Sequence, residues 1–406
     1  MSSVWSVEKG VSAFHQPGRQ PVEADISNQG LVCRTAEELI RSGDPAGAME
    51  TVCRGIERCG ASGELEELRE RIRGGRVKIA FFCGGDGDTF LKEILSYVGQ
   101  RYPMRVFEGS TSGQMHELMR WSDISWFEWC TSLAAAGTNL PKVCSNIIRL
   151  HRYEAYFPWP EKICWENVDL LITVGNSFVP DALRRWVPDI EKRVAMATIP
   201  NGVNLERIPF TRRTAGKNLA FAASMRMVKN PMFLLTCMAE LHSAAPEHKL
   251  FIAGKFPDLL LEQYFWHQIK ALGLEDVVVF DGWQEDIAGW LEDKHYIVST
   301  SVIESQGMGI LEAMAAGLKP VIHNFPGAEE IFSGRFLFNS PAEFCRQILS
   351  EDYDSVQYRE FVERRYPLRR QLMQINEVFA YFEQQRQGGI FSVQPSTCSV
   401  QTGFTI

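Results

Sequence analysis

The sequence has no long hydrophobic run and no excess of positive charge. No stretch of about 18 apolar residues is present to span a bilayer, and the start, MSSVWSVEKG, lacks the apolar core of a signal peptide. A formal net charge of −8 argues against a general nucleic-acid-binding surface, because phosphate binding needs basic residues. These absences predict a cytoplasmic protein without a nucleic-acid partner.

The sequence also lacks a pattern of metal ligands. Its 10 cysteines are scattered, with no C-x-x-C pair and no histidine–cysteine cluster at metal spacing, which predicts reduced thiols and no metal site. The stretch CGGDGDT (83–89) is glycine-rich but is not G-x-G-x-x-G, so it gives only weak support to a dinucleotide site. We expect neither a metal nor a cofactor.

The chain of 406 residues is too long for one ordinary core, and strands alternate with helices from Val77 onward. Such alternation predicts βαβ units and parallel sheets covered on both faces. The strands expected in a first domain are KIAFFC (78–83), MRVF (104–107), ISWFEW (124–129), VCSNIIRL (143–150), LLITVG (170–175) and VAMATIP (194–200). After a polar break at TRRTAGKN (211–218), a second set follows: LAFAAS (219–224), KLFIAG (249–254), VVVFDG (277–282), YIVSTS (296–301), KPVIHN (319–324) and RFLFN (335–339).

The remaining segments flank these two domains. Helical segments with breaks at 43–45 and 60–63 resemble one tetratricopeptide-type helix pair plus a third helix. Because a single such unit cannot bury its own face, a helical cap packed on the next domain is the alternative. The predicted parts are a helical extension with a loose terminus (1–76), a first Rossmann-like domain (77–204) completed by 368–386, a second Rossmann-like domain (205–367) and a flexible tail (388–406).

Two glutamates lie in ESQGMGILEAMAAG (304–317), after the expected strand that ends at Ser301. Ligands of open α/β sheets bind outside the carboxyl ends of the strands, so this loop is a candidate site. The helix is expected to begin near Gly307 to Gly309, where its N–H groups can meet a phosphate. Glu304 in the loop and Glu312 early in the helix can accept hydrogen bonds from sugar hydroxyls. A solvated helix glutamate and a loop acid are the alternative.

The spacing E-x7-E, followed by AMAAG and the next strand, resembles the donor-binding signature of retaining glycosyltransferases of the GT-B fold, family 4 (glycosyl transferases group 1). IPNGVNLERIPF (199–210) resembles the family's P-N-G-V-[DN] element, and we expect Asn201 and Gly202 to form a tight turn with positive φ. FAASMRMVKNP (221–231) resembles the element in which Arg226 and Lys229 would grip the nucleotide diphosphate; a solvated basic loop is the alternative.

The resemblance implies further site residues. His151, in RLHRYEAY (149–156), would lie near the reacting sugar, although a lone histidine is more often a surface or core residue. WFEWC (126–130) is interpreted as core packing, with sugar binding through its aromatic faces and Glu128 as the alternative. The other residues implied are the donor-binding Gly307, Met308, Gly309 and Trp283, and the phosphate or acceptor loop Gly84, Gly85 and Asp86, for which a simple tight turn is the alternative.

The resemblance implies an α/β protein of GT-B architecture, with two doubly wound Rossmann-like domains facing a cleft. Its expected function is hexosyl transfer from a nucleotide diphosphate sugar to a glycan, lipid-linked or protein acceptor, with retention of configuration and without a metal. Glu304 and His151 would be catalytic. An inactive scaffold of the same shape and a nucleotide-sugar epimerase are the alternatives. A contact with a partner protein through residues 31–76, or a peripheral contact with the inner membrane face, is left open.

Overall fold

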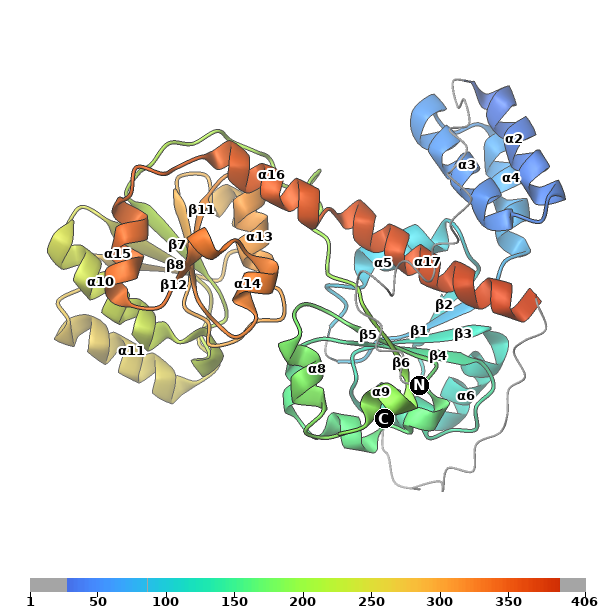
Figure 1. Cartoon of the computed structure of the whole chain (residues 1–406), viewed down its shortest axis with the longest axis horizontal. Coiled ribbons are helices and arrows are strands. Elements are labelled where there is room, and N and C mark those ends of the chain that lie inside the picture. Colours follow the sequence, from blue (N-terminus) through green and yellow to red (C-terminus); the bar gives the residue numbers. More distant parts are fainter. Residues whose placement is uncertain (1–27, 86, 388–406) are drawn as a thin grey trace. The chain divides into compact units, whose positions relative to one another are not determined.

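The computed structural model describes residues 28–85 and 87–387 and divides into two compact units. The first unit holds residues up to Val174, 180–199 and those from Leu372 onward, and the second holds Gly175–Val179 and Pro200–Gln371. Each unit contains a six-stranded sheet (Figure 1). Both sets of strands expected from the sequence are present, so the α/β prediction is confirmed.

All neighbouring strands in the first unit are parallel, in the order β2-β1-β3-β4-β5-β6. The strands are β1 (Ile79–Phe82), β2 (Met104–Val106), β3 (Ile124–Glu128), β4 (Ser145–Leu150), β5 (Leu170–Thr173) and β6 (Ala195–Thr198). Strands β1, β3, β4 and β5 are buried along their whole length. Strands β1 and β5 are nearly continuous apolar runs, as expected for such strands, whereas β4 also buries Ser145, Asn146 and Arg149.

Helices cover both faces of this sheet. The helices are α5 (Lys92–Gly99), α6 (Ser112–Trp121), α7 (Ser132–Thr138), α8 (Phe178–Leu183), α9 (Ile190–Arg193) and α17 (Leu368–Gln387). On one face, Phe379 of α17 packs edge-on against Phe81 of β1 and Trp126 of β3. On the other face, Gly137 of α7 fits against Phe127, where any side chain would clash with the ring. The last helix is therefore part of the core of the first unit.

Three helices precede the first sheet, and the second and third begin at the two breaks that the sequence predicts. They are α2 (Gln29–Arg41), α3 (Pro45–Cys59) and α4 (Gly63–Gly74). Asp44 caps α3 with its side chain and Pro45 opens the first turn, while Ser62 caps α4. The helices share a small apolar core of their own, formed by Val32, Cys33, Ala36, Ala48, Met49, Val52, Cys53, Leu65, Leu68 and Ile72.

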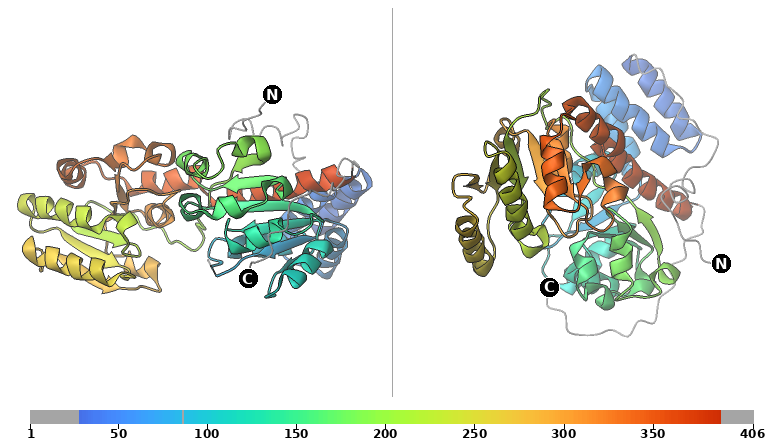
Figure 2. Two further views of the ribbon diagram at one scale, coloured as in Figure 1. Left: turned by 90° about the horizontal axis from the view of Figure 1, so that it is seen from below. Right: turned by 60° about the vertical axis from the view of Figure 1, so that its left-hand side comes forward.

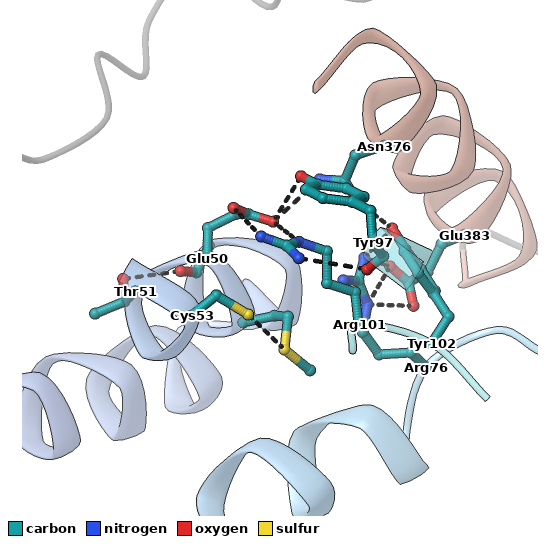
Figure 3. Close-up of polar contacts among 11 residues, drawn as sticks. Glu50, Thr51, Cys53, Arg76, Tyr97, Arg101, Tyr102, Asn376 and Glu383 are labelled. Carbon is teal, nitrogen blue, oxygen red and sulfur yellow. Dashed lines mark hydrogen bonds and ion pairs between the residues drawn. The ribbon is translucent and has the colours of Figure 1, made fainter. Parts of the chain in front are cut away.

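The three helices pack on the first sheet's helices through a polar network (Figure 3). Glu50 of α3 accepts a hydrogen bond from Arg101, at 2.7 Å, and a longer one from Asn376 of α17, at 3.4 Å. Beside them, the buried Arg76 forms an ion pair with Glu383 of α17 at 2.7 Å. A cap docked on the first domain, which was one of the two interpretations of this region, is therefore what the structure shows.

We expect Glu50→Ala to loosen this cap. The buried guanidinium of Arg101 would lose its carboxylate, and because Glu50 itself is partly exposed the loss should be about 1–2 kcal/mol. Hydrogen exchange of the α3 amides should report it as faster local opening, with Glu57→Ala, an exposed change on the same helix, as the matched control. Equal exchange in both variants would contradict a stabilising role for the network.

The second unit also has a parallel sheet, in the order β12-β11-β10-β7-β8-β9. Its strands are β7 (Asn218–Ala222), β8 (Lys249–Ala253), β9 (Val278–Gly282), β10 (Tyr296–Ser299), β11 (Lys319–His323) and β12 (Leu337–Phe338). The last strand is shorter than RFLFN predicts, because Arg335 and Phe336 belong to a 3-10 turn, Gly334–Phe336.

Two helical layers enclose the second sheet. The helices are α10 (Pro231–Ala244), α11 (Leu259–Ala271), α12 (Ile287–Trp290), α13 (Met308–Ala315), α14 (Ala328–Ile331), α15 (Pro341–Leu349) and α16 (Ser355–Arg365). Buried residues of α10, α11 and α15 share one core with the sheet, and those of α13, α14 and α16 share another. Helices α10 and α11 run side by side in both views (Figures 1 and 2).

The expected tight turn at Asn201–Gly202 is wrong in its backbone conformation. Neither residue has a positive φ. Gly202 is required for a different reason: an added Cβ would lie 2.3 Å from the Cα of Leu368, and the glycine N–H donates to the side chain of Gln371 at 2.7 Å. Tertiary packing against the start of α17, not turn geometry, therefore explains this glycine.

The described residues contain neither a membrane-spanning helix nor a cluster of metal ligands. No helix between residues 28 and 387 is both long and apolar enough to cross a bilayer. Within the same part of the chain, no group of three or more His, Cys, Asp or Glu side chains is placed to hold a metal ion.

Candidate functional site

The strand order of the second unit reverses between β7 and β10. The chain goes from β7 to β8 and β9 on one side, and then crosses to β10 on the other side. At such a switch point the loops after the two strands diverge and leave room for a ligand. In this structure two hydrogen bonds connect the loop after β7 with the loop after β10. The Thr300 hydroxyl donates to the Lys229 carbonyl at 2.9 Å, and the Val302 N–H donates to the Val228 carbonyl at 2.9 Å.

Glu304 and Lys229 form an ion pair across this switch point. Ser301 also donates to the same carboxylate oxygen, Oε1, at 2.8 Å. Glu304 is 8% exposed, and its second oxygen, Oε2, accepts no hydrogen bond from the described residues. The carboxylate is thus held from one side and keeps one oxygen for a ligand hydroxyl.

Arg226 lies in the same loop after β7 but is not paired. Its side chain is exposed, and within residues 28–85 and 87–387 its guanidinium forms neither a hydrogen bond nor an ion pair. The backbone around it is fixed, because the Arg226 carbonyl accepts from the Lys229 N–H at 2.9 Å. An unpaired guanidinium beside a switch point is suited to bind an anionic group.

Helix α13 begins at the end of the loop after β10. Gly307 precedes it with φ of 73°, a left-handed conformation that glycine adopts without strain. The N–H groups of Met308 and Gly309 donate to no group in the described part of the chain, as expected for a first helical turn. Gly309 is exposed, and an added Cβ would meet only a backbone oxygen at 4.0 Å. The predicted helix start is confirmed, and its free donors face an open approach.

Glu312 projects from α13 and is half-buried. No hydrogen bond or ion pair involves its carboxylate among the described residues, and burial raises its pKa above the ordinary value of a glutamate. Burying a carboxylate without a partner is unfavourable. A ligand hydroxyl that donates to it would supply the missing interaction.

Asn201 is attached to the loop after β10 through its backbone, whereas Trp283 lies at the edge of the sheet. Asn201 is buried, and its backbone N–H and carbonyl are both bonded at 2.7 Å to the side-chain amide of Gln306 in the loop after β10. Trp283 follows the edge strand β9, is 64% exposed and contacts Lys255 through its ring face. The structure therefore brings Arg226, Lys229, Glu304, Glu312 and the start of α13 to the neighbouring β7 and β10 strand ends, and leaves Trp283 at the sheet edge.

The first unit has its own switch point, between β1 and β3. Gly84 and Gly85 lie in the loop after β1, whereas Asp86 lies outside the described residues. The Trp129 indole, at the end of β3, donates to the Gly87 carbonyl at 2.8 Å and so joins the two loops. Trp129 has φ of 75°, a conformation that side chains other than glycine rarely adopt.

His151 follows the neighbouring strand β4 and is 5% exposed. Its ring packs against Trp129, with centroids 4.1 Å apart, and against Phe90 at 5.1 Å. Its Nε2 lies 2.8 Å from Glu128, which is itself buried and paired with Arg149. Sequence reasoning named Glu128 only as an alternative and did not predict this contact. The sequence signal that could have pointed to Glu128 was the alternation of side chains along β3, which puts Trp126 and Glu128 on the same face of the strand.

The second unit is similar to a known protein family. Residues 216–350 match the family model of the glycosyl transferases group 1. Over these residues the chain is similar to the glycosyl transferases group 1. An alpha-monoglucosyldiacylglycerol synthase of Streptococcus pneumoniae is 25% identical over 177 residues, which cover 39% of this chain and 38% of that protein. The chain thus matches well under half the length of this curated relative.

Solved structures resemble this chain over a wider region. Anabaena HepE, in complex with UDP and glucose, has a TM-score of 0.60 and 16% identity, and covers 75% of this chain and 100% of its own. Staphylococcus aureus TarM, in complex with fondaparinux, alpha-GlcNAc-glycerol and UDP, has a TM-score of 0.55 and 18% identity, and covers 65% of this chain and 58% of its own. At this level of identity the likeness establishes the fold, which is GT-B.

Proposed function

We propose that this chain is a glycosyltransferase whose donor is a nucleoside diphosphate sugar bound by the second unit. One observation carries the proposal. The loops at the β7–β10 switch point hold the Arg226 guanidinium and precede the helix that carries the half-buried Glu312 carboxylate, and neither group has a partner among the described residues. A nucleoside diphosphate offers the complements of both, namely anionic oxygens and ribose hydroxyls. UDP is the first candidate, because it occupies the structures of HepE and TarM.

Each part of the donor has a group to receive it. The diphosphate would meet Arg226 and the N–H groups of Met308 and Gly309, and the ribose would donate to Glu312. The transferred sugar would donate a hydroxyl to the Oε2 atom of Glu304. Lys229 would hold the Glu304 carboxylate in place.

Charge explains how this arrangement would accelerate transfer. Positive charge develops on the sugar as its bond to the diphosphate breaks, and negative charge grows on the departing oxygens. Arg226 and the first turn of α13 would stabilise the departing diphosphate, so the proposal requires no metal. His151 in the first unit would contact the sugar. Retention of configuration, implied by the resemblance to family 4, is part of the proposal and is tested by NMR of the product anomer.

The acceptor is proposed only as a class, a hydroxyl of a glycan, a lipid-linked molecule or a protein. The pneumococcal relative is named for a glucosyl lipid, whereas TarM binds alpha-GlcNAc-glycerol. Both names are compatible with small glycerol-containing acceptors as the first compounds to try.

Calorimetry with a panel of nucleoside diphosphates tests the donor site directly. We expect micromolar binding of one of them, with UDP first, and weaker binding by both Arg226→Ala and Glu312→Ala. Absence of binding by every nucleotide would overturn the proposal and favour an inactive scaffold. Product analysis without an acceptor would separate a transferase from an epimerase, since only the epimerase changes the nucleotide sugar itself.

The raised pKa of Glu312 predicts a pH dependence of nucleotide binding. Ribose hydroxyls donate to the ionised carboxylate, so affinity should fall on acidification, beginning above the pH at which an ordinary glutamate protonates. Glu312→Gln should weaken binding about 10-fold near pH 8 and abolish this part of the pH dependence. Titrations of both proteins from pH 8 to pH 5 would show the difference; parallel curves would contradict the ribose contact.

The same carboxylate has a separate effect on stability. A carboxyl whose pKa is raised by folding destabilises the folded state as pH rises through that pKa, because the folded protein holds its proton more tightly than the unfolded chain does. Glu312→Gln should therefore make the ligand-free protein more stable at neutral pH while it weakens nucleotide binding. A general folding defect would lower both quantities.

A further inference from the structure

Three side-chain nitrogens converge on the carboxylate of Glu128 at the end of β3. The Trp126 indole donates to Oε2 at 2.8 Å, and the Arg149 guanidinium donates to Oε1 at 2.8 Å. The His151 Nε2 atom lies 2.8 Å from the same Oε1. Glu128 is 2% exposed, so water cannot replace any of these partners at low cost.

The chemistry of Glu128 decides which histidine nitrogen carries the proton. Burial acts to raise the pKa of Glu128, but the Arg149 guanidinium and the hydrogen bonds of His151 and Trp126 outweigh it and hold the pKa at about 2. An ionised carboxylate only accepts hydrogen bonds. The Nε2 atom of His151 must therefore be the protonated one, and in the neutral ring Nδ1 keeps its lone pair.

The other ring nitrogen is left for a ligand. Nδ1 of His151 has no hydrogen-bond partner in the described part of the chain. The ring is fixed between Phe90 and Trp129, and the backbone N–H of His151 donates to Glu154 at 3.1 Å. Trp129 holds its unfavourable positive φ in this same contact, and such backbone strain persists only where the surrounding structure enforces it.

We propose that Glu128 is a positioning residue: it holds His151 in the Nε2–H tautomer, so that Nδ1 accepts a hydrogen bond from a hydroxyl of the sugar substrate. The catalytic part of this inference rests on the proposed glycosyl transfer. The tautomer does not, because it follows from contacts within the first unit alone. Arg149 and Trp126 fix the carboxylate, and the carboxylate fixes the imidazole.

The tautomer can be read from the whole protein by NMR. With histidine labelled by ¹⁵N in the full chain, the two ring nitrogens give distinct shifts according to which is protonated, and His151→Gln identifies the His151 signals by their loss. We expect an unprotonated Nδ1 and a protonated Nε2 in the neutral ring. The reverse assignment would overturn the inference whatever the protein's activity is.

Two substitutions separate hydrogen-bond chemistry from packing. Aspartate still only accepts hydrogen bonds, whereas glutamine has the size of glutamate but presents an N–H₂ group to at least one of three donors. Glu128→Asp should therefore keep the tautomer and lose less kcat than Glu128→Gln, for which we expect a fall of about 10- to 100-fold with a mixed tautomer. A packing role predicts the opposite order, because aspartate leaves a cavity. If Glu128→Gln does not fold, the NMR spectra of the wild type and of Glu128→Asp still show whether His151 is in the Nε2–H tautomer.

Nucleotide binding in the same variants keeps the two proposals apart. Glu128 belongs to the first unit, so UDP affinity should be unchanged in Glu128→Gln while kcat falls. Normal UDP binding and an unchanged kcat would overturn only the positioning role. A wild-type protein that binds no nucleotide and transfers no sugar would overturn the proposed function, and the NMR result would then stand or fall by itself.

Discussion

Replacing Arg226 by alanine is expected to lower kcat/KM for the nucleotide sugar by about 10²- to 10³-fold, the loss typical of one charge-stabilising donor. The guanidinium is exposed and has no hydrogen-bond or ion-pair partner among the described residues, so we expect its removal to leave the fold intact. The arginine should stabilise the bound nucleotide, and should stabilise the transition state more strongly, once the diphosphate begins to leave. UDP calorimetry measures its effect on binding, and steady-state kinetics measure its effect on the transition state.

Two further variants make this result interpretable. Arg226→Lys keeps the charge but loses the planar, two-pronged donor geometry, so it should fall between wild type and alanine. Arg346→Ala removes an exposed arginine of the same unit on α15 and should change neither binding nor rate. If Arg226→Ala also leaves both unchanged, the diphosphate is bound elsewhere. If it lowers thermal stability, the arginine has a structural role that the contacts do not show.

The strands were predictable because short apolar-rich segments alternate with helical segments along the chain. The positions of Arg226, Glu304 and the start of α13 at strand ends followed from the same pattern, together with the rule that ligands bind beyond the carboxyl ends of strands. Local signals also located α3 and α4, since Asp44 and Ser62 cap them with their own side chains. A cleft between the domains stays a prediction.

Contacts between distant segments were not predictable. Glu304 forms an ion pair with Lys229, and the Gln306 side chain forms hydrogen bonds with the backbone of Asn201. Both contacts arise because the strand order brings together loops that are far apart in the chain. Gly202 was assigned a positive φ from turn preference, but the close approach of Leu368 is what requires a glycine there. Sequence patterns report local geometry, and these partners depend on strand order and on packing across the fold.

Glu304→Gln should lower kcat by about 10²- to 10³-fold and change the KM for the donor much less. Glutamine keeps the shape and can still accept from Ser301, but it removes the charge that holds Lys229 and weakens the acceptor offered to the sugar hydroxyl. That hydrogen bond should strengthen as positive charge develops on the sugar, so its loss affects the transition state more than the bound donor.

The ion pair supplies a sharper test of this role. If Lys229 acts mainly by holding Glu304, then Lys229→Met should reduce kcat by itself and add little to Glu304→Gln, so the two losses would not be additive. Additive losses would instead give Lys229 its own contact with the diphosphate. Glu329→Gln, an exposed change on α14, is the matched control. A Glu304→Gln protein with normal kcat and lower thermal stability would show that the pair only joins the two loops, and the sugar contact would then have to be sought at another residue.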